Sequence, residues 1–220
     1  MACLTQAAWT LWMLGYPDQA LERSRAAITL AQELSHPHSL AFARCFVAEL
    51  HQFRREARAA QERAEAAITL STEQGLPFWL ARGVFERGWA LAEQGLEEEG
   101  IAQIRQGLAA FWATGANLWR SCHLGLLAEA YGKAGRTEEG LAAVVEALDW
   151  VQSHGNRSYE AELYRVKGEL LLAQESKNQK AKGKSQKLEN TDPRPLTPNP
   201  QAEAEAEEYF LKAIEIAQKQ

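Results

Sequence analysis

The chain has 220 residues, of which 46% are apolar and 24% are charged, so it is able to bury a core and is not disordered throughout. Its formal net charge of −5 provides no general attraction for phosphate backbones, so nucleic acid is not expected as a partner. No apolar run approaches the roughly 20 residues that cross a bilayer, and the N-terminus lacks a signal pattern. We therefore expect no membrane partner and a cytoplasmic location.

The predicted elements, in chain order, are five helical hairpins, each made of a first helix (helix A), a tight turn and a second helix (helix B). Residues that stop and start helices place the hairpins at about 2–34, 38–74, 77–114, 117–154 and 157–219. Glycine occupies most of the turns, at Gly15, Gly95 and Gly135, and Arg55 stands at the same phase in the second hairpin. Glycine ends a helix well because it adopts positive φ without a Cβ clash.

The hairpins repeat every 40 residues. The sequence AAITL at positions 26–30 returns unchanged at positions 66–70. Small residues return with the same period, at Ala8, Ala48, Gly88, Ala128 and Gly168 on helix A, and on helix B at Ala20, Ala60, Gly100 and Gly140 and again at Ala27, Ala67, Gly107 and Ala147. Two helices approach to about 8–10 Å only where the side chains at the crossing are small. The pattern therefore predicts an all-α solenoid of about five closely nested, stacked hairpins.

The fifth hairpin is interrupted by an insertion. Gly168 predicts a small partner 12 positions later, yet the matching residue is Ala206, which indicates that 26 residues have been inserted. The stretch 174–200 is rich in Lys, Asn, Gln and Pro, so we expect it to be disordered. The predicted organisation is hairpins one to four and the first helix of the fifth over 1–173, a disordered Lys/Pro-rich insertion over 174–200, and the second helix of the fifth hairpin over 201–220.

These residues resemble the tetratricopeptide repeat, whose pattern is matched in the first hairpin by Ala8, Leu11, Gly15, Ala20 and Ala27. The resemblance covers nearly the whole chain, although the period is 40 and not about 34, and the proline that usually ends helix B is missing. It implies a right-handed superhelix that binds protein or peptide segments. Long repeats of this kind are similar to the C-terminal arrays of bacterial signalling ATPases, of adenylate or guanylate cyclases and of LuxR-type regulators, which implies a sensor or assembly region of a larger protein.

The resemblance also implies that the A helices line a binding groove. Carried over position by position, the partner-binding residues are Trp9, Trp12, Glu49, Phe53, Arg82, Phe85, Trp89, Glu129 and Arg165. Aromatic side chains and arginine are frequent anchors of binding surfaces. We hypothesise that the three tryptophans, Phe85 and Arg82 hold an apolar segment of a partner. The alternative is that the aromatic rings fill gaps between adjacent hairpins.

No motif in the sequence indicates catalysis. The five histidines are not paired at ligand spacing on one helix face, and no phosphate-binding loop or nucleophile elbow occurs. We therefore expect no enzyme activity, cofactor or metal here, and any catalysis would belong to another part of a parent protein. The first functional hypothesis is a protein–protein interaction scaffold, and the alternative is a regulatory domain that binds a small effector. An open channel between the A helices favours the first, and a deep closed pocket favours the second.

Overall fold

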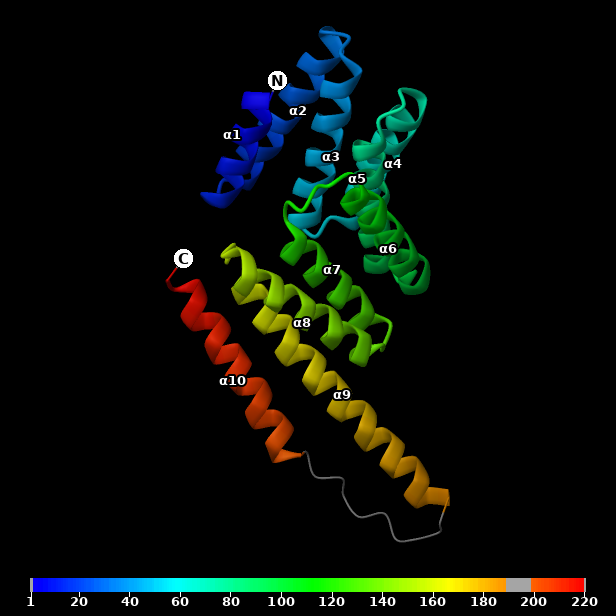
Figure 1. Ribbon diagram of the computed structural model, residues 1–220, viewed down its shortest axis with the longest axis vertical. Coiled ribbons are helices and arrows are strands. Elements are labelled where there is room, and N and C mark those ends of the chain that lie inside the picture. Colours follow the sequence, from blue (N-terminus) through cyan, green and yellow to red (C-terminus); the bar gives the residue numbers. More distant parts are fainter. Residues whose placement is uncertain (1, 189–198, 220) are drawn as a thin grey trace. The chain divides into compact units, whose positions relative to one another are not determined.

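The computed structural model describes residues 2–188 and 199–219. In this part of the chain the secondary structure is ten helices and no strand (Figure 1). In chain order the helices are α1 (Ala2–Met13), α2 (Pro17–Glu33), α3 (Pro37–Phe53), α4 (Ala57–Glu73), α5 (Pro77–Glu93), α6 (Glu97–Ala113), α7 (Arg120–Lys133), α8 (Thr137–His154), α9 (Glu160–Leu188) and α10 (Pro200–Ala217). The predicted all-α fold of five helical hairpins is confirmed, with each odd-numbered helix as helix A and the next helix as helix B.

The helices form two compact units, an N-terminal unit over Met1–Asn117 and a C-terminal unit over Leu118–Gln220. The N-terminal unit holds α1 to α6, and the C-terminal unit holds α7 to α10. Within each unit, a helix A packs on its own helix B and also on the neighbouring helix A. The helices A of one unit therefore share a surface, which we call its A-helix face. No helix in the described part of the chain is long and apolar enough to span a membrane.

The turns within the first four hairpins share one backbone conformation. The second residue after the end of each helix A has positive φ, at Gly15 (81°), Arg55 (58°), Gly95 (87°) and Gly135 (71°). In the first turn the N–H of Tyr16 then donates to the carbonyl of residue 11, at 2.8 Å. This bond satisfies a carbonyl that the end of α1 would otherwise leave unpaired. Arg55 is the one residue of these four that is not glycine, and it adopts the same positive φ.

The small residues lie where the helices of a hairpin cross, as the 40-residue period predicts. In the third hairpin a Cβ added to Gly107 of α6 would lie 2.6 Å from the backbone nitrogen of Phe85 of α5. A Cβ added to Gly100 would lie 2.6 Å from the carbonyl oxygen of Gly88. The backbones of α5 and α6 are therefore in direct contact, which only glycine at these positions permits.

Aromatic side chains fill the space between the second and third hairpins. Trp79 of α5 is buried with Ala41 and Cys45 of α3, and Phe42 packs against this cluster. The Trp79 and Phe42 rings meet edge to face at 5.3 Å, and the Trp79 indole N–H donates to the Nε2 of His38 at 3.1 Å. These contacts tie α3 to α5 and hold neighbouring helices A in register.

The fifth hairpin forms from α9 and α10, which lie side by side in the C-terminal unit (Figure 1). A Cβ on Gly168 would meet the Phe210 ring at 2.7 Å, so the small residue of α9 receives an aromatic side chain of α10. The rings of Tyr164 and Tyr209 stack at a centroid distance of 5.9 Å. Buried Ala206 lies in the same helix, as its assignment to the second helix of this hairpin predicts.

The expectation of disorder from residue 174 differs from the structure, because α9 continues to Leu188. The Lys, Gln and Ala residues in this stretch are good helix formers, and a helix that is already nucleated extends at little cost. Lys177 also donates to the carbonyl oxygen of Gly135 at 3.3 Å, which links the extension to the α7–α8 turn. The rest of the expected insertion, residues 189–198, lies outside the described residues.

Candidate functional site

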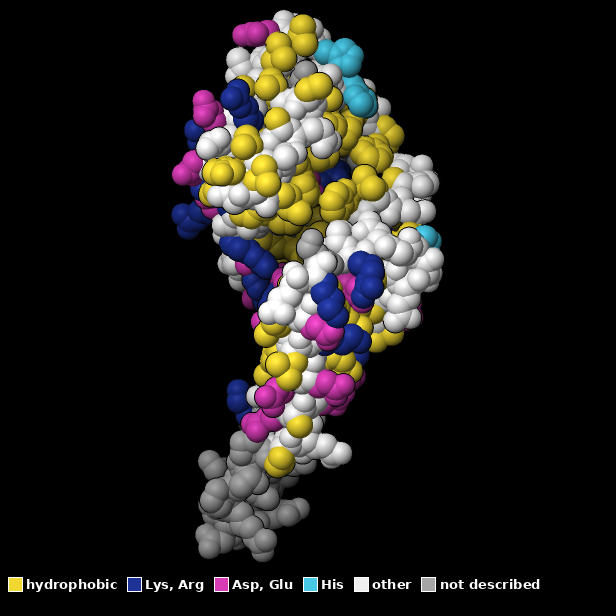
Figure 2. Space-filling view, turned by 90° about the vertical axis from the view of Figure 1, so that its left-hand side faces the viewer, with side chains coloured by type: hydrophobic (Ala, Val, Ile, Leu, Met, Phe, Trp, Pro, Cys, Tyr) yellow, Lys and Arg dark blue, Asp and Glu magenta, His cyan; other side chains and the backbone are white. Residues whose placement is uncertain are grey.

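Three of the expected groove residues come together on the A-helix face of the N-terminal unit. Trp9 and Trp12 lie on α1, and Phe53 is the last residue of α3. The Phe53 ring meets Trp9 edge to face at a centroid distance of 5.2 Å and stacks on Trp12 at 6.1 Å. All three side chains are half-buried. We call this group the aromatic patch, and hydrophobic side chains also gather over the N-terminal unit in the upper part of Figure 2.

A buried ion pair connects the next two helices A. Arg82 of α5 lies 2.6 Å from a carboxylate oxygen of Glu49 of α3, and both residues are only 4% exposed. The guanidinium also lies over the Phe46 ring, at 4.9 Å from its centroid. Burial opposes the charge on Arg82, but the nearby carboxylates of Glu49 and Glu86 more than offset it and raise the pKa of the guanidinium. Arg82 therefore stays charged inside the fold.

Glu86, one turn after Arg82 on α5, completes this buried polar cluster. It is 1% exposed, and neither of its carboxylate oxygens has a hydrogen-bond partner among the described residues. Burial, together with the charge of Glu49, raises the pKa of Glu86 to about 8. Glu86 is therefore expected to be largely protonated at neutral pH.

The α5 side chains that were expected to line the groove are buried. Phe85 is 2% exposed and Trp89 is 1% exposed, so neither ring offers a surface to a partner, and Arg82 is engaged with Glu49. The expected contact of these three residues with an apolar segment does not fit this geometry. Their burial agrees with the alternative that aromatic side chains on helix A serve packing.

Gln52 and Glu86 are two buried polar residues of this region that the sequence did not single out. The Nε2 of Gln52 and the Nε1 of Trp89 are buried donors without a hydrogen-bond partner among the described residues. The two carboxyl oxygens of Glu86 are also buried without a hydrogen-bond partner among the described residues. Buried polar groups are usually paired, and one that is left unpaired is costly. The sequence does not indicate which Glu or Gln of a helix A is buried without a partner, because the same residue types are common on exposed helix faces.

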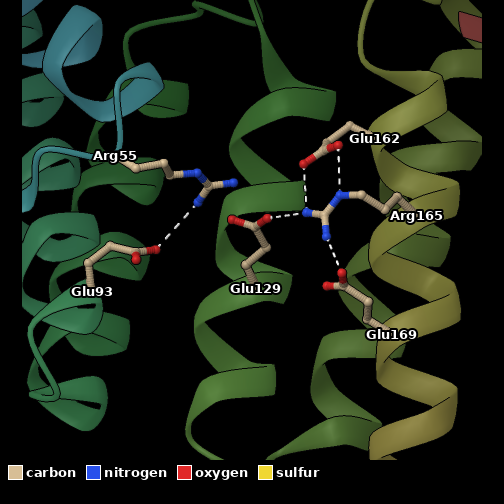
Figure 3. Close-up of polar contacts among 6 residues, drawn as sticks. All are labelled: Arg55, Glu93, Glu129, Glu162, Arg165 and Glu169. Atoms are coloured by element: carbon tan, nitrogen blue, oxygen red, sulfur yellow. Dashed lines mark hydrogen bonds and ion pairs between the residues drawn. The ribbon is translucent and has the colours of Figure 1, made fainter.

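The C-terminal unit holds the remaining expected residues, in an acidic cluster around Arg165 (Figure 3). The Nη2 of Arg165, on α9, lies 2.6 Å from Glu129 of α7 and 2.7 Å from Glu162, and its Nη1 pairs with Glu169. The hydrogen bond to Glu162 is the largest of the effects that raise the pKa of Arg165. Glu129 and Arg165, which the resemblance places among the groove residues, thus bind each other across α7 and α9.

A second polar contact joins two hairpins of the N-terminal unit. Arg55, in the turn after α3, reaches a carboxylate oxygen of Glu93 at the end of α5, at 3.5 Å (Figure 3). The Arg55 side chain is about half exposed. Surface pairs of this kind contribute little to stability, on the order of 0–1 kcal/mol.

No arrangement in the described part of the chain provides metal chemistry. Among the residues whose side chains the structure describes, no group of three or more His, Cys, Asp or Glu could hold a metal ion. Burial raises the pKa of the Cys45 thiol to about 12, so this cysteine is not a thiolate nucleophile at neutral pH.

Comparison with solved structures identifies the fold. The chain is similar to the apo form of RapI, with a TM-score of 0.62 and 13% identity over 98% of this chain and 82% of that one. A putative kinesin light chain of Podosopora anserina with nearly identical TPR-like repeats gives a TM-score of 0.57 and 16% identity over 99% and 95%. Aspartyl phosphate phosphatase F from Bacillus subtilis gives 0.60 and 16% over 98% and 59%. No protein-family model and no curated protein matches the sequence. At these identities the likeness establishes the tetratricopeptide-like fold alone.

Proposed function

We propose that the chain is a protein–protein interaction scaffold that binds a segment of a partner on the A-helix face of its N-terminal unit. The observation that carries the proposal is the aromatic patch, in which three half-buried rings from α1 and α3 meet. Such rings bury a large area on binding and lose few rotatable bonds, so they are favourable anchors for a partner.

The proposed partner segment is apolar or aromatic in character. Trp9, Trp12 and Phe53 offer ring surfaces, whereas Arg82 and Glu49 of the neighbouring cluster are buried and form an ion pair with each other. Stacked helical hairpins support this role because their side-by-side helices present extended surfaces to other chains. In the proposal, Phe85 and Trp89 support the binding face from inside and do not touch the partner.

A peptide selection with matched variants tests the proposal. The whole chain is immobilised, peptides are selected from a displayed library, and their affinities are measured for the wild type, for Trp12→Ala with Phe53→Ala, and for Trp150→Ala. Trp150 is the control because it is also a half-buried tryptophan, but it lies on α8 and stacks on His154. Loss of at least tenfold in affinity for the patch variant, with no loss for the control and unchanged helical circular dichroism, supports the proposal. Equal affinity for all three proteins overturns it.

We further propose that the chain is the sensor or assembly region of a larger bacterial signalling protein of the ATPase or nucleotide cyclase type. The support is the sequence resemblance of its 40-residue repeats to the C-terminal arrays of such proteins. An antibody raised against the chain provides the test, since it should detect a protein considerably larger than 24.5 kDa in extracts of the source cells. Detection of a 24.5 kDa species alone would contradict this part of the proposal.

A further inference from the structure

A crevice of about 370 Å³ opens between the first two hairpins of the N-terminal unit, and no residue of the aromatic patch lines it. It is lined by α2, α3 and α4, so two helices B form its walls and one helix A contributes to its lining. The volume lies at the lower end of the range for small-molecule sites, roughly 300–1,000 Å³. The crevice is therefore large enough for a small organic group.

The lining combines an aliphatic surface with two guanidinium groups. Ile28, Val47 and Ala59 supply apolar contacts, and Arg25 of α2 and Arg63 of α4 line the same space. Both arginines are exposed, and no ion pair or side-chain hydrogen bond of either occurs among the described residues. Their positive charge is thus uncompensated by direct contacts. Burial and the charge of Arg63 together lower the pKa of nearby Arg44.

A buried histidine adds a further polar group to this lining. His51 of α3 is 7% exposed, and its Nδ1 lies 2.7 Å from a carboxylate oxygen of Glu56. Burial opposes ionisation of Glu56, but the hydrogen bonds with His51 and Arg54 lower the pKa of its carboxyl group. An ionised Glu56 accepts from Nδ1, so Nε2 is the ring nitrogen left for another partner.

The next repeat shows that these features are not required by the fold. Forty residues further, Arg87, Glu99 and Gln103 stand where the crevice has Val47, Ala59 and Arg63. The Nε of Arg87 donates to Gln103 at 2.7 Å, and Gln103 donates to Glu99 at 3.1 Å. Long side chains at the equivalent positions therefore bond to one another. In the second hairpin, the shorter side chains of Val47 and Ala59 leave the space open and Arg63 without such a partner.

We propose that this crevice binds a carboxylate carried at the end of a short aliphatic chain. Arg25 and Arg63 hold the carboxylate, because guanidinium groups match carboxylate geometry with two parallel hydrogen bonds. Ile28, Val47 and Ala59 contact the aliphatic chain, so an inorganic anion makes no use of this apolar part of the lining. The chemistry fits two sources, which are a free small carboxylic acid and the C-terminal residue of a peptide.

Calorimetric titration of the whole chain tests the proposal with hexanoate, hexanol and inorganic phosphate. Hexanoate is expected to bind at least tenfold more tightly than the other two probes, because only hexanoate has both the charge and the apolar body. Two peptides separate the sources: N-acetyl-Gly-Gly-Leu with a free C-terminus and the same peptide as its amide. Tighter binding of the free-acid peptide than of hexanoate assigns the site to peptide termini, and the reverse order assigns it to free acids.

Variants connect any binding to the crevice. Arg25→Gln and Arg63→Gln should each weaken hexanoate binding about tenfold, since each removes a charged hydrogen bond. Val47→Arg with Arg63→Gln copies the Arg87–Gln103 pair of the third hairpin and should abolish binding by filling the space. Arg58→Gln is the matched control, because Arg58 is an exposed arginine of α4 outside the lining, and it should change the affinity less than twofold. The proposal is overturned if hexanoate does not bind, if hexanol or phosphate binds as tightly, or if Arg25→Gln and Arg63→Gln behave like the control.

Discussion

Replacing Gly107 with alanine tests the close contact between α5 and α6 on which the third hairpin depends. The added Cβ would lie 2.6 Å from the backbone nitrogen of Phe85 and 2.8 Å from the carbonyl oxygen of Ala81. Ordinary contact begins at 3.4 Å, so α6 must move away from α5 by about 0.8 Å. Both atoms belong to the backbone, so no change of rotamer relieves the overlap.

The expected net effect is a loss of stability. Overpacking of a close-packed interior costs roughly 1–3 kcal/mol, and the upper end applies because a whole helix has to shift. Alanine in a helix interior is favoured over glycine by about 1 kcal/mol, which offsets part of this cost. We therefore expect Gly107→Ala to lower the free energy of unfolding by about 2 kcal/mol, which corresponds to a fall of roughly 10 °C in the melting temperature of a unit of this size.

Gly132→Ala on α7 is the matched control for this prediction. The nearest atom to its added Cβ is the Cδ2 of Leu170, at 2.9 Å, which is the end of a flexible side chain. Leu170 can turn aside, so the gain in helix propensity remains and the stability should stay equal or rise by up to about 1 kcal/mol. Thermal unfolding followed by circular dichroism and by tryptophan fluorescence measures both variants, since five of the seven tryptophans lie in the N-terminal unit. An unchanged or raised melting temperature for Gly107→Ala would refute the backbone contact.

Three further predictions concern strain and buried charge. Ser35 has a left-handed φ of 48° where the next repeat has Gly75, so Ser35→Gly should stabilise the chain by roughly 0.5–1 kcal/mol in thermal melts, and Gly75→Ser should destabilise it by a similar amount. The pKa of Glu86 is raised from 4.5 to about 8 in the folded chain, so protonation of Glu86 favours the folded state. This contribution to the free energy of unfolding is complete below about pH 4.5 and is lost as the pH rises to about 8. Urea titrations between these pH values should therefore show a decline of up to about 1.4 kcal/mol per pH unit that is absent in Glu86→Gln. Arg82→Met leaves Glu49 buried without its ion-pair partner and should cost roughly 3–5 kcal/mol, whereas the double variant with Glu49→Met should recover most of the loss in a double-mutant cycle. A double variant no more stable than Arg82→Met alone would contradict this account of the pair.

The aromatic patch illustrates how far a sequence identifies a candidate site. The resemblance to tetratricopeptide repeats implied that Trp9, Trp12 and Phe53 face a shared groove, and the structure brings these rings into contact. The same reasoning included Phe85 and Trp89, which the structure buries. The difference arises because a position in the repeat specifies the direction of a side chain from its helix, whereas its exposure depends on the side chains that surround it in the folded chain.

The C-terminal part shows the limit of composition as a guide to order. The polar stretch from residue 174 was expected to be disordered, yet it continues α9 to Leu188. A segment with few apolar residues cannot form a core by itself, but it can extend a helix whose first turns are anchored by buried side chains such as Leu163 and Leu170. In this polar stretch, which has few apolar residues to bury, helix propensity favours continuation of α9.

By itself, the sequence determined the five hairpins, the positions of most turns and the closeness of the helix pairs. These depend on properties that each residue carries locally, namely the positive φ that glycine adopts at Gly15 and the missing Cβ at Gly100 and Gly107. Tertiary structure alone decided the burial of Arg82 with Glu49 and the opening of the crevice beside Val47. Both depend on which side chains of other helices occupy the neighbouring space, and a repeat pattern does not specify how those side chains fill it.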